Sequence, residues 1–204
     1  MSSYPIPNVI ARDGRGERVM DVYSQLLSER IIYLGTAIDA GVANTVIAQL
    51  LHLESANPTS PISLYINCEG GDPSAMLAIY DSMQYVKAPV ATTCVGQAFG
   101  VSAVLLAGGE PGGRAMLPHT RIVLHQPALN TGRAAVPDLI LHADELVRVR
   151  GEMEKILSEH TGQSVATLRE DTDRDRVFTA EAARKYGLID EVLHSRPETP
   201  SYVG

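Results

Sequence analysis

The middle of the chain repeats one local pattern, and this repetition limits the possible folds more than any other feature. A short β-prone apolar run is followed by a glycine-containing turn and then by apolar residues at helical spacing. The pattern occurs over residues 62–86, with its turn at Gly70-Gly71, and over residues 90–107, with its turn at Gly96–Gly100. Strands that alternate with helices in this way predict an α/β fold built from β-β-α or β-α units.

The flanking segments extend this pattern. Asp39 is a candidate N-cap for a helix whose apolar face is Val42, Val46, Leu50 and Leu53. Pro137 stands at the first position of a long amphipathic helix. Further elements are expected as helices over 20–27 and 180–186, and as strands over 31–34, 121–124 and 188–193. The 204 residues favour one domain over 19–196, with a mobile N-terminal arm over 1–18 and a flexible tail over 197–204.

Charge and composition exclude several classes of function. The net charge of −7 and a pI near 5.3 argue against binding to nucleic acid or to an anionic membrane surface. The longest apolar run, 101–107, is too short to span a bilayer, and no basic-then-apolar leader is visible, so a cytoplasmic location is expected. Cys68 and Cys94 form no disulfide framework, and no Cys/His spacing suggests a metal site.

Four features have residue types suited to catalysis, and each also has a structural interpretation. Gly70-Gly71 lets backbone N–H groups approach an oxyanion, although such a turn is more often only a turn. The 96–102 turn opens a helix, where a nucleophile or close helix packing are both reasonable. His125 ends a strand and suits a general base, but a lone histidine is more often structural. The 171–176 run is a salt-bridged loop or a source of the acid that orients His125, either Asp171 or Asp175.

Taken in order, these and other segments resemble the proteolytic subunit of the Clp protease over most of the chain. The matching segments are Arg15–Arg18, Asp21–Ser24, Leu64–Asn67 with Gly70-Gly71, Ile79–Gln84, Gly96–Ala98, Leu124–Pro127, His160–Gln163, Asp171–Arg176 and Tyr186–Asp190. The resemblance implies a Clp protease/crotonase-like spiral of β-β-α units with a protruding handle helix at about 137–160. It also implies two stacked heptameric rings fed by a hexameric AAA+ unfoldase.

The family cleaves unfolded polypeptide with a Ser-His-Asp triad, and the resemblance places His125 as the base and Asp175 as its acid. The family pattern Gly-Gln-Ala-Ala-Ser-Met-Gly puts the nucleophile at Gly100, which has no side chain. Ser102 is two residues further along a helix, a rotation of about 200° away from His125, so it is not expected to substitute. The oxyanion donors, the backbone N–H groups of Gly71 and Val101, do not depend on side chains.

The resemblance also assigns contact surfaces. Asp173 and Arg174 fill the places of an inter-ring contact, and Tyr65, Tyr85 and Leu193 remain from an unfoldase docking pocket. Ser63, Thr93 and Ala115 stand where larger apolar groups are usual, which implies weaker docking. The chain itself needs no cofactor, because the partner unfoldase uses the ATP.

Further departures lie at the active site. Cys68, Glu69 and Asp72 replace Ser, Pro and Ser, and two carboxylates there would oppose a negative intermediate. Phe99 adds bulk where a small residue is usual.

Three functions are therefore weighed. The favoured one is a subunit that is inactive alone and that assembles with itself or with an active paralogue, as a structural or regulatory member of the ring. The second is an active Clp-type serine endopeptidase that degrades unfolded proteins with an unfoldase. The third is a crotonase-like acyl-CoA enzyme, which uses a similar pair of backbone donors.

Overall fold

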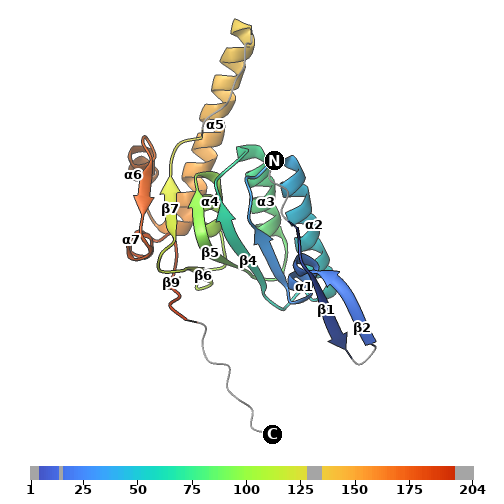
Figure 1. Cartoon of the computed structure of the whole chain (residues 1–204). Helices are drawn as coiled ribbons and strands as arrows, with labels where there is room; N and C mark the ends of the chain where they lie inside the picture. Colours follow the sequence, from blue (N-terminus) through green and yellow to red (C-terminus); the bar gives the residue numbers. More distant parts are fainter. Residues whose placement is uncertain (1–4, 14–15, 128–134, 196–204) are drawn as a thin grey trace.

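The computed structural model describes residues 5–13, 16–127 and 135–195, and within them the chain has a mixed α/β fold (Figure 1). The strands are β1 (Asn8–Asp13), β2 (Gly16–Asp21), β3 (Ile31–Leu34), β4 (Ile62–Cys68), β5 (Val90–Phe99), β6 (Arg114–Met116), β7 (Arg121–Leu124), β8 (Arg176–Phe178) and β9 (Glu191–Val192). The helices are α1 (Val22–Ser28), α2 (Ala40–Ala56), α3 (Pro73–Tyr85), α4 (Val101–Ala107), α5 (Val136–Thr161), α6 (Val165–Asp171) and α7 (Ala180–Tyr186).

Seven strands form the main sheet, in the order β3-β4-β5-β6-β9, with β7 paired to β5 and β8 paired to β7. All pairs are parallel except β7 with β8. The long strand β5 pairs with β6 through residues 92–94 and with β7 through residues 97–99. The predicted α/β class is confirmed, and the parallel sheet follows from the helices that separate successive strands.

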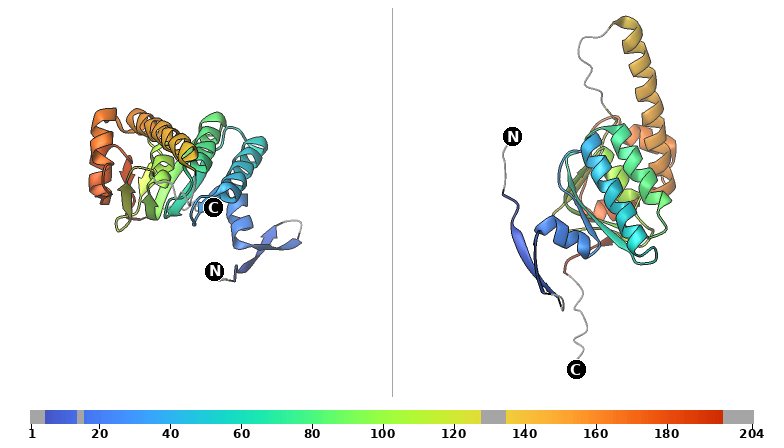
Figure 2. Two further views of the ribbon diagram at one scale, coloured as in Figure 1. Left: turned by 90° about the horizontal axis from the view of Figure 1, so that it is seen from above. Right: turned by 90° about the vertical axis from the view of Figure 1, so that its right-hand side faces the viewer.

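Helices α2, α3 and α5 lie together on one face of the sheet (Figure 2). The side chains of β4 alternate accordingly: Ile62, Leu64 and Ile66 are fully buried under the helices, whereas Ser63 and Tyr65 on the other face are half-buried. The short helix α4 is buried along its whole length. The hydrophobic core therefore lies between the sheet and this single helical layer.

Two predicted helix starts are capped by aspartates, of which only Asp39 was predicted as a cap. The Asp39 carboxylate accepts a hydrogen bond from the amide of Val42 (2.8 Å), and the buried face of α2 is Ala43, Val46, Leu50 and Leu53. Val42 itself is only partly buried. Asp72 caps α3 by accepting from the amide of Ala75 (2.7 Å), immediately before Pro73. The Asp72 carboxylate, expected beside the oxyanion site, is thus bound to the start of α3.

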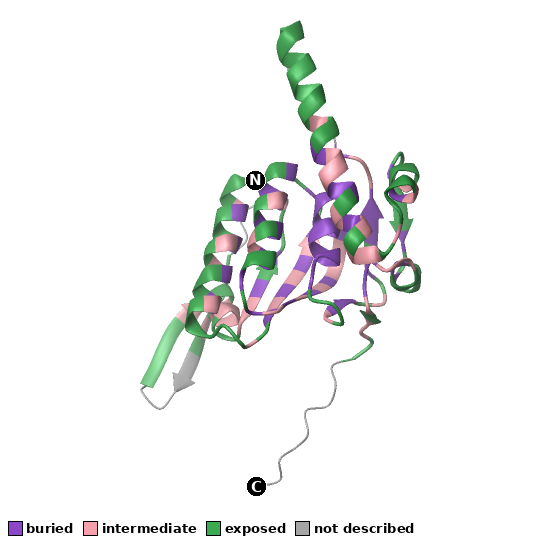
Figure 3. Cartoon of the chain, turned by 180° about the vertical axis from the view of Figure 1, so that it is seen from behind, coloured by how far each residue is buried: buried purple, intermediate pink, exposed green. Residues whose placement is uncertain are grey.

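The long helix predicted over 137–160 is α5, which spans 26 residues and ends at Gly162 in the left-handed conformation (φ 74°). Its base carries the buried residues Val149, Met153, Glu154 and Leu157. Its first half extends beyond the body of the protein and is exposed (Figure 3). Several apolar side chains there face solvent, namely Val136, Leu139, Ile140, Leu141 and Val147.

The N-terminal segment differs from the sequence expectation. Residues 8–21 were expected to contain no packed element before Met20, but β1 and β2 form an antiparallel hairpin that projects from the body (Figure 1). The two strands of the hairpin are held together by their backbone pairing rather than by a buried core, because the side chains of Ile10 and Val19 remain mostly exposed. Helix α1 then begins at Val22, because the carboxylate of Asp21 accepts from the amides of Tyr23 and Ser24. The flexible tail predicted over 197–204 lies outside the described residues.

Several short elements were not predicted. Strands β6 and β8 have three residues each, which is too few for a repeated alternation, and in the seven residues of α6 only Leu168 is buried. Strand β5 continues through residues 96–99, which were expected to be a turn, because they pair with β4 and β7. The closing strand predicted over 188–193 is shorter than expected. It is limited to the two residues of β9, which pair with Ala115 and Met116 of β6.

Candidate active site

Three segments that the sequence singled out meet at one edge of the sheet. Strands β4, β5 and β7 are parallel neighbours, so the turns that follow them are adjacent. Gly70-Gly71 follows β4, Gly100 follows β5 and His125 follows β7. These segments line a cleft of about 100 Å³ whose walls are Glu69, Gly70, Gly71, Pro73, Phe99, Val101, His125 and Pro127.

Gly100 forms the sharp turn between β5 and α4. Its dihedral angles are φ 55° and ψ −111°, a conformation that is strained for residues with a side chain. Its amide donates to the carbonyl of Val123 (2.8 Å), and its carbonyl accepts from Ala103 (3.0 Å). Such a strand-to-helix turn exposes a nucleophile in hydrolases, and the residue at this turn is a glycine without a side chain.

The imidazole of His125 occupies the space that the missing side chain would need. A β-carbon on Gly100 would lie 2.7 Å from His125 Nδ1 and 3.0 Å from Nε2, and closer still to Cε1. These distances are too short for atoms that do not share a bond. The position expected for a nucleophile is therefore filled by the residue expected to be its base.

His125 is held by packing rather than by the hydrogen bonds of a triad. Its buried Nδ1 has no hydrogen-bond partner within residues 5–13, 16–127 and 135–195, although a triad histidine donates from this atom to its acid. The ring contacts Phe99, with centroids 4.5 Å apart and planes at 44°. Burial lowers the pKa of His125, and the negative charge of Asp175 opposes this in part. The histidine is therefore held in its neutral form.

Asp175 lies near His125 but is exposed. Both residues line a cavity of about 520 Å³ together with Gln126, Thr172, Asp173 and Arg174. Asp171, the alternative acid, is engaged elsewhere, because it pairs with Arg176 and accepts a hydrogen bond from the hydroxyl of Tyr186 (2.6 Å). Of the two candidate acids, Asp175 is therefore the one whose negative charge acts on His125.

The proposed inter-ring residues are on the surface. Arg174 and Asp173 are highly exposed, and their nearest charged atoms are 3.9 Å apart. Such a solvent-exposed pair contributes little to stability, so both side chains are accessible to another molecule.

Both residues that carry the backbone donors of the expected oxyanion site line the cleft. Gly71 bridges Ile38 in parallel fashion: the amide of Ile38 donates to Gly70 (2.8 Å), and the amide of Asp72 donates to Ile38 (2.7 Å). This pattern leaves the N–H of Gly71 on the side opposite Ile38. Val101 is the first residue of α4, so its N–H has no acceptor within that helix.

Ser102 has a structural role that the sequence did not reveal. It is fully buried, and its Oγ accepts from the amide of Phe99 (2.8 Å). The hydroxyl lies 3.1 Å from the carbonyl of Cys68 and 3.0 Å from that of Phe99, so it donates to one of them. Ser102 thereby joins the ends of β4 and β5, and no recorded bond links it to His125. A buried serine in an otherwise apolar helix was the only signal for this role.

The expected docking residues lie on different kinds of element. Tyr65 pairs in register with Tyr33 and Thr93, and Thr93 pairs with Ala115, so these residues form a row on the face of the sheet without helices. Leu193 follows β9 at the end of this row and is half-buried. Tyr85 is 80% exposed, but it lies at the end of α3 rather than on a strand.

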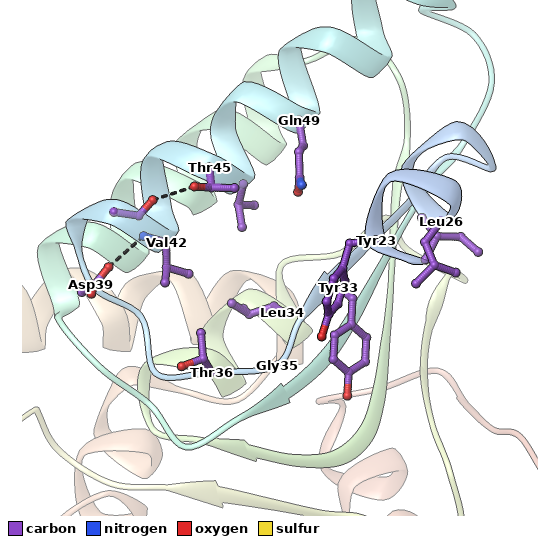
Figure 4. A pocket seen from close by; sticks show the side chains of 13 residues that line it. Tyr23, Leu26, Tyr33, Leu34, Gly35, Thr36, Asp39, Val42, Thr45 and Gln49 are labelled. Carbon is purple, nitrogen blue, oxygen red and sulfur yellow. Dashed lines mark hydrogen bonds between the residues drawn. The ribbon is translucent and has the colours of Figure 1, made fainter. Parts of the chain in front are cut away.

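A larger cavity, of about 650 Å³, lies between α1, β3 and α2, away from the cleft (Figure 4). Apolar residues such as Leu34 and Val42 line it, with Tyr23 and Tyr33 at one side. None of the predicted catalytic residues borders it.

The described part of the chain shows neither a metal-binding cluster nor a helix that could span a membrane. Residues 5–13, 16–127 and 135–195 hold no group of three His, Cys, Asp or Glu side chains arranged to bind a metal. Burial raises the pKa of both the Cys68 and Cys94 thiols, which keeps these cysteines protonated. Within the same ranges, no helix has the length and apolar character to cross a membrane.

Comparison with known proteins gives consistent matches. Residues 14–196 match the family model of Clp protease. The chain is 68% identical over 197 residues to the "ATP-dependent Clp protease proteolytic subunit 1" of Nocardia farcinica, covering 96% of this chain and all of the relative. It is 58% identical over 196 residues to proteolytic subunit 2 of Streptomyces avermitilis, covering 96% and 98%, and 55% identical over 193 residues to proteolytic subunit 4 of Rhodococcus jostii, covering 95% and 99%.

Proposed function

The chain belongs to the Clp protease family, and we propose that within it this protein is a ring subunit without its own nucleophile, which serves as a structural or regulatory partner of an active paralogue. One observation carries the proposal: Gly100 stands at the nucleophile elbow, and the ring of His125 fills the space above it. Removing the nucleophile from a serine protease lowers turnover by about 10⁶. The isolated chain is therefore expected to cleave no peptide measurably.

The other serine near the elbow supports this proposal. Ser102 is fully buried, and its hydroxyl is committed to the backbone of Phe99 and Cys68. A nucleophilic serine needs a base within hydrogen-bond reach of its hydroxyl. The hydrogen-bond partners of Ser102 in the described residues are backbone atoms and not a base, so Ser102 is not expected to serve as the nucleophile.

The exposed half of α5 supports assembly. Its apolar side chains, such as Ile140, Leu141 and Val147, are 58–70% exposed in the single chain. A contiguous apolar stripe of this kind needs a partner to bury it. We therefore expect this helix to lie between two stacked heptameric rings, with Asp173 and Arg174 at the same junction.

The proposal assigns the remaining steps to partners. An AAA+ unfoldase in the cytoplasm uses ATP and delivers unfolded polypeptide, and the active paralogue cleaves it. Gly71 and Val101 still line the cleft, so this subunit keeps donors that can bind an extended peptide backbone. Glu69 borders the same cleft and disfavours a negative intermediate there.

An active serine endopeptidase is the alternative that the test must exclude. The purified chain is treated with a fluorophosphonate probe and, separately, with a fluorogenic peptide. We expect neither an adduct nor hydrolysis, and the Ser102→Ala variant should behave identically. An adduct on any serine of the wild-type chain, or hydrolysis that disappears in Ser102→Ala, would refute the proposal. Copurification of a tagged chain with an active paralogue tests the second half of the proposal.

The acyl-CoA alternative receives no support from the comparisons, since the family match covers residues 14–196 and names Clp protease. Direct measurement of acyl-CoA binding to the purified chain tests it, and we expect no binding.

A further inference from the structure

We propose that Phe99 is a positioning residue that holds His125 over Gly100, so that two residues close this site rather than one. The inference rests on the proposed function. It goes further by predicting that a serine at position 100 is not sufficient to rebuild the nucleophile and that the side chain of Phe99 must also be reduced.

The first argument is the position of the Phe99 ring. It contacts the imidazole of His125 at a centroid distance of 4.5 Å. The ring is also close to the glycine turn, because Phe99 Cδ1 would lie 3.7 Å from a β-carbon on Gly70. The ring therefore lies near both the glycine turn and the histidine, and all three line a cleft of only about 100 Å³.

The second argument is that the backbone of Phe99 is fixed on both sides. Its amide donates to Ser102 Oγ (2.8 Å), and its carbonyl lies 3.0 Å from the same oxygen. It also pairs in register with Val123 of β7, and the amide of the next residue, Gly100, donates to Val123 (2.8 Å). The ring cannot leave the cleft by a backbone shift without breaking these bonds.

The third argument is that little else fixes the imidazole. Its Nδ1 has no hydrogen-bond partner in the described parts of the chain, and Asp175 is exposed to solvent. A triad histidine is oriented by hydrogen bonds to its acid and its nucleophile. The position of the imidazole is therefore set by its contact with the ring of Phe99 and by the absence of a side chain on Gly100.

These contacts predict what happens when only the serine is restored. In Gly100→Ser, the new β-carbon would collide with His125 Cε1 and Nδ1 and contact Nε2 tightly, so the imidazole must move aside. Phe99 occupies one side of that ring and restricts this movement. Shortening Phe99 to alanine removes the obstacle, so the histidine can rotate and accept the serine proton.

The test compares Gly100→Ser, Phe99→Ala and the double variant, each as the full chain, by their rates of labelling with a fluorophosphonate probe, in which the serine oxygen bonds to phosphorus and fluoride leaves. We expect the double variant to react at least about tenfold faster than Gly100→Ser, and Phe99→Ala alone not to react. The double variant Phe99→Leu with Gly100→Ser keeps an apolar side chain in case alanine destabilises the fold. It should react at an intermediate rate.

A second measurement does not need a nucleophile. Modification of His125 by diethyl pyrocarbonate, mapped by mass spectrometry, reports how accessible its ring is, and the exposed His119 serves as the internal reference. Phe99→Ala should increase the modification rate of His125 severalfold while leaving that of His119 unchanged.

Two outcomes would overturn the inference: a labelling rate of Gly100→Ser as high as that of the double variant, or a modification rate of His125 that is unaffected by Phe99→Ala. Neither result concerns the proposed lack of activity, which fails if the wild-type chain itself is labelled by the probe or hydrolyses the peptide through Ser102.

Discussion

Replacing Glu154 with alanine tests how the base of α5 is held against the site. Glu154 is 2% exposed, yet it is charged. Its carboxylate accepts from Arg150 Nε (2.8 Å) and from the guanidinium of Arg169 (2.6 and 3.1 Å). Arg150 in turn donates to the side chain of Gln126 (2.9 Å), the residue after His125. The network therefore joins α5 to the strand end that carries the histidine.

The expected loss of stability in Glu154→Ala depends on how far water can replace the carboxylate for the two arginines. Removing one member of a fully buried ion pair costs about 3–5 kcal/mol. Here the arginine side chains are 26% and 62% exposed, so water can replace the carboxylate in part. We therefore expect Glu154→Ala to lower the free energy of unfolding by about 2–3 kcal/mol. For a chain of this length, that is a decrease in Tm of about 5–10 °C.

Scanning calorimetry at a fixed protein concentration measures this change. Glu152→Ala is the matched control, because Glu152 lies on the same helix and pairs with Lys155 (3.2 Å) at the surface, where such a pair contributes at most about 1 kcal/mol. Glu154→Gln, which removes the charge but keeps the shape, should fall between the two. Equal Tm values for Glu154→Ala and Glu152→Ala would show that the buried network does not hold α5 in place.

Two further predictions concern the glycines and the histidine. Gly71→Ala should destabilise the fold by about 2–4 kcal/mol in urea unfolding, because φ is 139° and the new β-carbon would collide with the backbone of Ile38. Gly151→Ala, in the helical and open environment of α5, should instead stabilise the chain by about 0.5–1 kcal/mol, and similar losses for both would contradict this reasoning. For His125, burial lowers the pKa in the folded chain, so below about pH 6.5 the unfolded chain binds a proton that the folded chain does not. Stability should therefore fall as pH drops from 7.5 to 5.5, and by less in His125→Asn; an equal loss in both proteins would count against a depressed pKa.

The sequence predicts the long helices, whose apolar spacing extends over several turns. Asp39 and the spacing of Val46, Leu50 and Leu53 locate α2 almost to the residue, and Pro137 locates the start of α5. Strand β8 could not be found in this way, because its three residues become a strand only by pairing with β7. Its order is a tertiary effect, and local propensity does not encode it.

The candidate site could also be predicted only in part from the sequence. The resemblance aligns Gly100 with a nucleophile and names His125 and Asp175, and the parallel register of β4, β5 and β7 brings the first two together. The position of the imidazole was not predictable, since it depends on the volume that a missing side chain leaves. The hydrogen bonds of Ser102 could not be predicted either, because its partners are backbone atoms of Cys68 and Phe99.

The backbone angles of Gly100 make a substitution at this turn costly. Glycine adopts φ 55° and ψ −111° freely, whereas a serine there would store about 1–3 kcal/mol of strain. Under the inference drawn for Phe99, replacing this glycine with serine would lower stability, and a second change at Phe99 would still be needed before the serine could react. One substitution at this turn would therefore cost stability without supplying a reactive group.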